Sequence, residues 1–367
     1  MHPSSRQHNQ AGFSVIEMMV ATTVMLIITA AVVSLLRSSM SVSTATYELT
    51  DAQENLRVAH EFISRDLVTA GDGLKSMSNI PVAEAFVTNY LDSNPIPAVA
   101  GVVNLGILTT ENSVAVDKTV WGAAGPGVAT SPVVKVRSNP VQTDRQTILE
   151  IDPNFQSISL VPNKIKSDGT EITILDGDLP RFTEGEIYFL TSTRGGTFGV
   201  LTKKVDDGTT TPNSILEFKT GAADKLGINV TGTPANGFKT ISNSGALTTA
   251  LQRMKMIHYF VDTNGRLMRR VFGVKGAPFR DSAIAEHVVS VQFLYFLGTN
   301  ATGIAPQPVV QLTDLAQQIA VRQVEVTITV ETPHKLEKNR QPQISSSQTT
   351  SVRNMQFRQA LQPTALP

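Results

Sequence analysis

The chain has 367 residues and a mass of 39.5 kDa, and its 31 basic and 31 acidic side chains leave no net formal charge. Charged residues make up only 17% of the chain, which argues against a coiled-coil rod or a highly charged disordered protein. The absence of cysteine excludes thiol catalysis, iron–sulfur clusters, cysteine-type zinc sites and disulfides. The balanced charge gives no general attraction to nucleic acid, and the six scattered histidines form no pair at helical metal-binding spacing. Composition therefore predicts a protein that is not an enzyme and has no catalytic residues, no cofactor and no metal site.

An apolar run covers residues 13–36, directly after a polar stretch over residues 1–12. The run has 24 residues, contains neither proline nor glycine, and carries one charge, Glu17. A helix of this length rises about 36 Å, enough to cross a hydrocarbon core of roughly 30 Å. A cleaved secretory signal would be shorter and would have its small residue after the run, whereas Gly12 precedes it. We therefore expect a transmembrane helix, and an uncleaved signal anchor is the simplest alternative.

The carboxylate of Glu17 needs a partner inside this apolar run, because a charged side chain in a membrane segment costs about 2.5–3.5 kcal/mol. Glu17 lies one helical turn after Phe13. A cut between Gly12 and Phe13 would create an ammonium group at the start of the helix. That group could pair with Glu17 of the same chain or of a neighbouring subunit, and the second pairing would fix the axial register between subunits.

The segment Gly12-Phe13-Ser14-Val15-Ile16-Glu17 and the apolar helix after it resemble the cleavage and methylation motif of type IV pilins and type II secretion pseudopilins. The resemblance implies cleavage after Gly12 by prepilin peptidase, N-methylation of Phe13 and an assembly role for Glu17. It implies other minor and major pilins as partners through the helix, together with the inner-membrane assembly platform and membrane lipid. Arg6 and Arg37 flank the run on opposite sides, so their charges leave the orientation open. The resemblance puts the leader in the cytoplasm and the C-terminal domain in the periplasm, before export to the pilus and cell surface.

A second helical pattern continues beyond the apolar run. Small and apolar residues recur at steps of three and four, which is the period of one helix face; they are Ala45, Leu49, Ala52, Leu56, Ala59, Ile63, Leu67 and Ala70. Gly71 and Gly73 then predict the end of the helix. We expect one helix over residues 13–70 that lays an apolar stripe on a globular domain, with a dimeric coiled coil as the alternative. The stretch LRVAHEFISRDLVTAG (56–71) also resembles PilW-type minor pilins.

The remainder of the chain is predicted to consist of strands and loops. Residues 71–250 read as a β- and loop-rich insertion, in which residues 74–140 hold loops and short strands and residues 207–249 form a long loop. Strands are expected at 147–151, 157–161, 186–191, 198–205 and 215–218. Residues 251–367 read as a C-terminal antiparallel sheet with a polar tail. Its strands are an Asn-Gly hairpin over 256–272, an apolar strand at 288–297 covered on both faces, an alternating strand at 324–330 and a strand at 350–355.

With 41% hydrophobic residues the chain can bury a sizeable core. An antiparallel sheet packed on the amphipathic half of the helix is an α+β arrangement, and the resemblance implies the pilin fold.

Three local features allow competing interpretations. A basic cluster counts seven cations against one acid, or +6, over residues 253–280, and could bind DNA phosphates or contact a subunit; its cations are Arg253, Lys255, Arg266, Arg269, Arg270, Lys275 and Arg280. Acidic turns at 168–171, 176–178 and 206–208 read as ordinary Asp-Gly turns rather than calcium loops. Glu286-His287 and His258 lack an accompanying nucleophile, so structural roles are expected for them.

The sequence as a whole predicts a PilW-like minor type IV pilin that takes part in pilus assembly or initiation, at or near the tip. A pseudopilin of a type II secretion system is the first alternative. A tip adhesin or DNA-binding pilin is the second, with nucleic acid the less favoured ligand. An unprocessed membrane-anchored periplasmic protein is the third.

Overall fold

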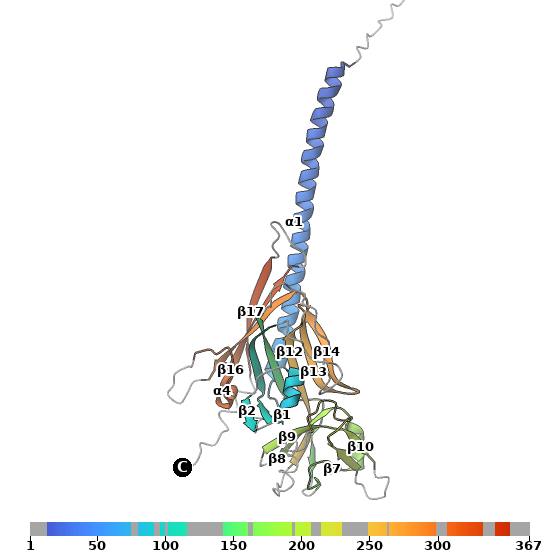
Figure 1. Cartoon of the computed structure of the whole chain (residues 1–367), viewed down its shortest axis with the longest axis vertical. Coiled ribbons are helices and arrows are strands. Elements are labelled where there is room, and N and C mark those ends of the chain that lie inside the picture. Colours follow the sequence, from blue (N-terminus) through green and yellow to red (C-terminus); the bar gives the residue numbers. More distant parts are fainter. Residues whose placement is uncertain are drawn as a thin grey trace, which may run out of the picture. The chain divides into compact units, whose positions relative to one another are not determined.

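A computed structural model describes the chain in twelve segments: residues 13–74, 80–91, 96–99, 102–115, 142–160, 164–192, 195–206, 214–229, 249–262, 264–298, 307–332 and 342–352 (Figure 1). The chain divides into two compact units. The first comprises Met1–Asp51 and Thr332–Pro342, and the second comprises Ala52–Glu331 and Gln343–Pro367. The predicted leader, residues 1–12, lies outside the described residues.

Helix α1 (Val15–Thr69) is one uninterrupted helix, close to the predicted span of 13–70. No proline or glycine occurs within it, so no backbone hydrogen bond is lost along its length. It ends where the sequence predicts, because Gly71 and Gly73 adopt the left-handed conformation with φ of 74° and 71°. A Cβ atom at Gly73 would lie 2.6 Å from Cγ1 of Ile151, so this position also requires glycine for space.

In the second unit, α1 buries the predicted apolar stripe from Ala52 to Ala70, whereas Ala45 and Leu49, in the first unit, are half-buried. Ala59, Ile63 and Leu67 have no exposed surface, and Ala52, Leu56 and Ala70 are nearly as buried. These side chains share one core with residues of the sheets, among them Leu149 and Ile257. The prediction of a helix face packed on a sheet is confirmed.

A buried polar cluster joins the end of α1 to strands β12 (Thr249–Val261) and β13 (Leu267–Val274). Oδ2 of Asp66, in the last turns of the helix, accepts hydrogen bonds from the Tyr259 hydroxyl and from Nε of Arg269, each at 2.6 Å. Burial and the Asp66 charge raise the pKa of Tyr259, so the hydroxyl remains a donor. Because Asp66 is only 4% exposed, its carboxylate is stabilised by these two donors and by Arg65, whose Nε lies 3.6 Å from Oδ1, rather than by water.

The largest sheet has eight strands and is antiparallel throughout. Its main path runs β14-β13-β12-β5-β4, with β6 and β8 paired to β12 and β9 paired to β8. Besides β12 and β13, its strands are β4 (Leu108–Ala115), β5 (Gln142–Ile151), β6 (Ile158–Leu160), β8 (Ile187–Ser192), β9 (Gly195–Val200) and β14 (Ala277–Ala285). Strand β12 pairs with β8 through residues 249–253 and with β5 through residues 254–259. It therefore joins the pair β8–β9 to the pair β5–β4.

Three smaller antiparallel sheets complete the described strands. One has the order β1-β3-β2, from β1 (Ile80–Ala83), β2 (Ile96–Val99) and β3 (Val102–Leu105). The second has the order β10-β11-β7, from β7 (Glu171–Ile174), β10 (Lys203–Val205) and β11 (Ser214–Glu217). The third has the order β15-β16-β17, from β15 (Val288–Leu297), β16 (Val321–Glu331) and β17 (Gln343–Ser351).

Short helical elements connect several of these strands. A turn of α-helix, α2 (Glu84–Phe86), leads into a π-helical segment, η1 (Val87–Leu91). A 3₁₀ helix, η2 (Asp176–Arg181), precedes β8. Helix α4 (Leu315–Ala320) precedes β16 and begins at Asp314, whose side chain accepts a hydrogen bond from the Gln317 amide at 2.8 Å.

The second unit has two hydrophobic cores. The larger lies between α1 and the strands around β5, β12 and β15–β16. The smaller lies around β7, β8 and β11 and contains a cluster of three aromatic rings, Phe155, Phe182 and Tyr188, with centroid distances of 4.9–5.7 Å. The long helix followed by antiparallel sheets confirms the predicted α+β class, and this layout fits the pilin fold.

Most predicted strands are present, and two predictions need correction. Strand β15 is fully buried on one face only, because Gln292 on the other face is exposed and its neighbours there are half-buried. The last strand is Gln343–Ser351, and only its final two residues fall within the predicted 350–355. Its serines and glutamines lack the branched and aromatic groups that favour strands, but hydroxyl pairs across to β16 stabilise it: Thr327–Ser347 and Thr329–Ser345, each at 2.7 Å.

Replacing Asp66 should strongly destabilise the second unit. Asp66→Ala leaves Arg269 and Tyr259 without their buried acceptor, so we expect the free energy of unfolding to fall by about 3 kcal/mol. Glu61→Ala, on an exposed position of the same helix, should change it by less than about 0.5 kcal/mol. Urea denaturation of the full chain in nonionic detergent, followed by circular dichroism, measures both. Equal stability of the two variants would contradict this role for Asp66.

His60 contacts the edge of β17 from α1. Its Nε2 lies 3.2 Å from the Ser346 carbonyl and therefore carries the proton, while Nδ1 is buried and has no hydrogen-bond partner among the described residues. Burial lowers the pKa of His60, although the bond to Ser346 opposes the shift. Protonation would place a second N–H in a site that offers it no acceptor.

The free energy of unfolding should therefore fall as the pH drops below the ordinary histidine pKa of about 6.5, because the unfolded chain then binds a proton that the folded chain excludes. Above that pH His60 contributes no pH dependence. Denaturation of wild type and His60→Gln between about pH 7 and pH 5 should show the smaller decrease in the variant. The pKa of His258 is also lowered by burial, but this residue is present in both proteins and affects both profiles equally. Superimposable pH profiles would contradict the assignment.

Candidate functional site

The N-terminal segment of α1 brings two of the three predicted site residues into one turn. Phe13 is 86% exposed and precedes the helix, and Ser14 follows it. Oε2 of Glu17 accepts a hydrogen bond from the Ser14 amide at 2.9 Å. This is half of a capping box, in which the third helical residue reaches back to the residue before the helix. Gly12 lies outside the described residues.

This geometry places the Glu17 carboxylate at the positive end of the helix dipole, beside the amide that directly follows Phe13. In the uncut chain Glu17 therefore already has a partner, a backbone amide. A new amino group on Phe13 would appear next to that bond. The pairing of Glu17 with such a group, within the chain or between subunits, stays a prediction.

The first part of α1 buries none of its side chains. Every residue from Phe13 to Thr44 is exposed, including large side chains all around the helix such as Ile16, Leu26 and Leu35. An 18-residue window of this helix is long and apolar enough to cross a membrane, and none of it is buried. A helix that is apolar on all sides requires lipid or other helices around it.

The threonine hydroxyls within this segment are satisfied by the helix itself. The hydroxyls of Thr22, Thr23 and Thr29 donate to carbonyl oxygens one turn earlier, at 2.7–2.9 Å. Such bonds reduce the cost of placing a hydroxyl in an apolar environment. The threonines, which weaken the hydrophobic pattern in the sequence, are therefore compatible with a membrane environment.

A family model described as a prokaryotic N-terminal methylation motif matches residues 7–33. This match supports a type IV pilin-like prepilin. The motif implies processing by prepilin peptidase and pilin assembly, and the helix after it fits anchoring in the inner membrane. Gly12, Phe13 and Glu17 all fall within the matched residues. No curated protein and no solved structure matches the chain.

The predicted basic cluster is largely neutralised by carboxylates from elsewhere in the chain. The pairs are Arg253 with Asp152 and Glu186, Lys255 with Asp152, Arg266 with Asp262, Arg269 with Asp66, and Arg270 with Asp281. Four of these acids lie outside residues 253–280, so the count of +6 overstates the local charge. Five of the seven predicted cations are paired within the part of the chain that the structure describes, which leaves Lys275 and Arg280.

Two carboxylates of these pairs, Asp281 and Asp152, each accept several hydrogen bonds. The Arg270 guanidinium donates to both carboxylate oxygens of Asp281 at 2.6–2.7 Å and lies 3.8 Å from the centre of the Phe279 ring. Burial alone would raise the pKa of Asp152, but hydrogen bonds from Lys255, the Asn154 amide and Arg253 lower it below its ordinary value. These arginines serve the packing of the sheet rather than a surface patch.

The carboxylates of the first two acidic turns form hydrogen bonds or ion pairs with other residues of the chain. Oδ1 of Asp168 accepts from the amide and hydroxyl of Thr170, and Lys166 pairs with Asp168 and Glu171. Asp178 pairs with Arg181, and Asp176 accepts from the Ser214 hydroxyl. Among the described residues no group of three or more potential metal ligands occurs. Asp207 and Gly208 of the third turn lie outside them.

The predicted histidine and glutamate positions have structural surroundings. His258 is fully buried in β12, where its Nδ1 lies 2.9 Å from the Thr147 hydroxyl, and its ring stacks on Phe260 at 5.6 Å. His287 follows Glu286 in the turn between β14 and β15, with φ of 56°.

The sequence analysis named Lys275, as part of the basic cluster, but did not predict the pocket that Lys275 lines together with Lys204 and Lys225. These lysines belong to three separate segments, so no local pattern in the sequence connects them. Only the folded chain brings them together.

The neutralised cluster predicts weak binding to DNA. For full-length protein in nonionic detergent at about 0.15 M salt, we expect a dissociation constant for duplex DNA weaker than about 10⁻⁴ M, the weak end of non-specific binding. Fluorescence anisotropy with a labelled duplex measures it. A constant near 10⁻⁶ M that weakens steeply with added salt would contradict this interpretation.

Proposed function

We propose that this protein is a prepilin and a PilW-like minor pilin, a structural subunit that takes part in assembly or initiation of a type IV pilus. One observation carries the proposal: the methylation motif at residues 7–33 leads directly into a helix whose apolar surface is uncovered on every side. Prepilin peptidase would cut between Gly12 and Phe13 and methylate Phe13. Glu17 would then meet the N-terminus of a neighbouring subunit and set the register.

The same helix would serve two locations in turn. Before assembly, residues 13–36 would hold the chain in the inner membrane as a single-pass anchor, with the C-terminal domain in the periplasm. During assembly the membrane platform would transfer the helix from lipid to the pilus, where helices of other minor and major pilins would cover it. The same apolar surface of the helix would contact lipid before assembly and neighbouring helices after it, because both environments are apolar.

The remainder of the chain supports a low-copy role at or near the tip. A unit that comprises Ala52–Glu331 and Gln343–Pro367, with two hydrophobic cores, is large for a subunit repeated along a fibre. We also propose that its role is structural rather than enzymatic, since the buried charges of Asp66 and Asp152 are held in ion pairs within the fold.

The test compares two glutamates of α1 in the native host. Glu17→Gln removes the carboxylate at the start of the helix, whereas Glu54→Gln removes a carboxylate further along it. We expect wild type and Glu54→Gln in the sheared pilus fraction, with Glu17→Gln reduced there at least about tenfold, equivalent to about 1.4 kcal/mol. The Glu17→Gln protein should remain in the membrane fraction.

Two results would contradict the proposal. Equal recovery of Glu17→Gln and Glu54→Gln from sheared pili would exclude the register role of Glu17. Wild-type protein that is absent from pili, but copurifies with components of a secretion system, would replace the minor pilin by a type II pseudopilin.

A further inference from the structure

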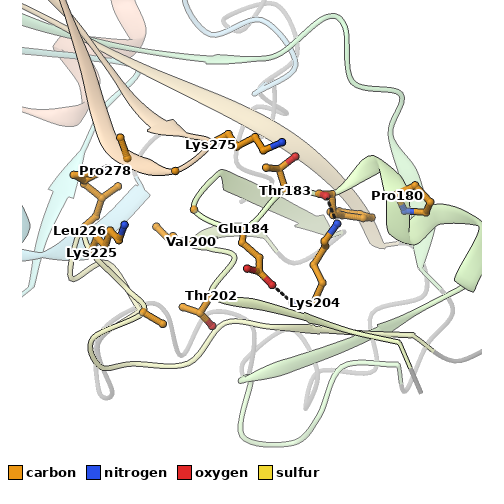
Figure 2. Close-up of a pocket in the computed structure, with 15 residues that line it drawn as sticks. Pro180, Thr183, Glu184, Val200, Thr202, Lys204, Lys225, Leu226, Lys275 and Pro278 are labelled. Carbon is orange, nitrogen blue, oxygen red and sulfur yellow. Dashed lines mark hydrogen bonds between the residues drawn. The ribbon is translucent and has the colours of Figure 1, made fainter. Parts of the chain in front are cut away.

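A pocket of about 630 Å³ opens in the second unit (Figure 2). Its walls come from the turn before β8, the end of β9, strand β10, the loop over residues 219–229 and the turn between β13 and β14. The turn at 184–185 lies against the β13–β14 turn, where a Cβ atom at Gly185 would be 3.5 Å from the Val274 carbonyl. Segments about 90 residues apart in the sequence therefore share one wall.

The lining combines an apolar surface with excess positive charge. Val200, Leu226 and Pro278 supply apolar atoms. Lys204, Lys225 and Lys275 lie on three different sides of the open space in Figure 2, and Glu184 is the one acid among the lining residues. Three cations and one anion give a net charge of +2. Apolar walls with a few convergent charges are typical of sites for small ligands.

The lysines of the pocket differ from the paired cations of the sheet. Among the described residues, neither Lys225 nor Lys275 forms an ion pair, whereas five cations on β12 and β13 or beside them do. The Glu184 carboxylate accepts the Lys204 backbone amide at 2.9 Å. The Lys204 ammonium donates to the Phe182 carbonyl at 2.9 Å, which leaves two of its hydrogens available. The lining therefore keeps an excess of two positive charges after Glu184 is counted.

The loop that carries Lys225 is fixed in place by buried polar contacts. The Tyr90 hydroxyl donates to the Lys225 carbonyl at 2.8 Å. The Asp224 carboxylate accepts the amides of Gly227 and Asn229 at 3.0 and 2.6 Å, and the Asn229 side chain bonds both backbone groups of Val200. Such a framework lowers the cost of positioning the lysine for a ligand.

We propose that this pocket binds a small organic anion, in which a carboxylate or phosphate group meets the lysine ammonium groups and an apolar part contacts Val200, Leu226 and Pro278. Ammonium groups act as point charges rather than planar forks, so they accept either anionic group. The proposal does not depend on N-terminal processing or on assembly, since every lining residue belongs to the second unit.

Calorimetric titration of the full chain in nonionic detergent tests the proposal with four probes. Phenyl phosphate and benzoate carry both an anion and an apolar ring, inorganic phosphate carries only the anion, and benzyl alcohol carries only the ring. We expect at least one of the first two to bind about tenfold or more tightly than either of the last two, equivalent to about 1.4 kcal/mol. The preferred probe identifies the anionic group.

Three variants locate the binding. Lys225→Gln combined with Lys275→Gln removes the charge and should weaken binding of the preferred probe at least about tenfold. Ala223→Trp, at an exposed position of the lining, should block the pocket while all three lysines remain. Lys203→Gln, an exposed lysine on β10 that is not part of the lining, should bind as wild type does.

The proposal is overturned if no probe binds at millimolar concentration, or if benzyl alcohol binds as tightly as the anions. It is also overturned if the double lysine variant and Ala223→Trp both bind as Lys203→Gln does. Circular dichroism of each variant confirms that a loss of binding is not a loss of folding.

Discussion

One α-helix carries two surfaces, and each has its own requirement for burial. Over residues 13–36 the helix is apolar on every side and none of its residues is buried, so lipid or other helices must cover it. Over residues 52–70 a single stripe is buried by the chain's own sheets. Because the helix is continuous, the same element that needs external partners also contributes to the core of the second unit. The prepilin-type motif at the start of the helix implies pilin assembly, in which other helices would cover the first surface.

Charge in the second unit is arranged mainly as pairs. Asp66 brings the end of the helix to Arg269 and Tyr259, and Asp152 holds two cations of β12. These pairs remove most of the positive charge that the sequence concentrates in the β12–β13 hairpin. Among the described residues, Lys225 and Lys275 form no ion pair, and they line a pocket that also has an apolar wall. The proposed recognition of an anion follows from that difference.

The sequence predicts the features that depend on local pattern, namely the helix with its two halves, the glycine stop at residues 71–73, and the hairpin around Asn264-Gly265. Sequence reasoning failed where tertiary contacts decide. In strand β14 four of the nine residues are exposed, two are buried and the pattern does not alternate, while β17 depends on hydroxyl pairs with β16. The basic cluster was misleading because its counter-charges lie up to about 200 residues away in the sequence, as in the pair of Asp66 with Arg269. The pocket could not be predicted either, because Lys204, Lys225 and Lys275 lie in three separate segments of the sequence.

The proposed function requires that the apolar helix become the N-terminus of a mature subunit. Mass spectrometry of the protein isolated from its native host, with and without prepilin peptidase, tests this claim most directly. A chain that begins at N-methylated Phe13 in normal cells, and at Met1 in cells that lack the peptidase, is the predicted result. A chain that begins at Met1 in both, or is cut elsewhere, would contradict the account and leave a membrane-anchored protein whose helix serves only as an anchor.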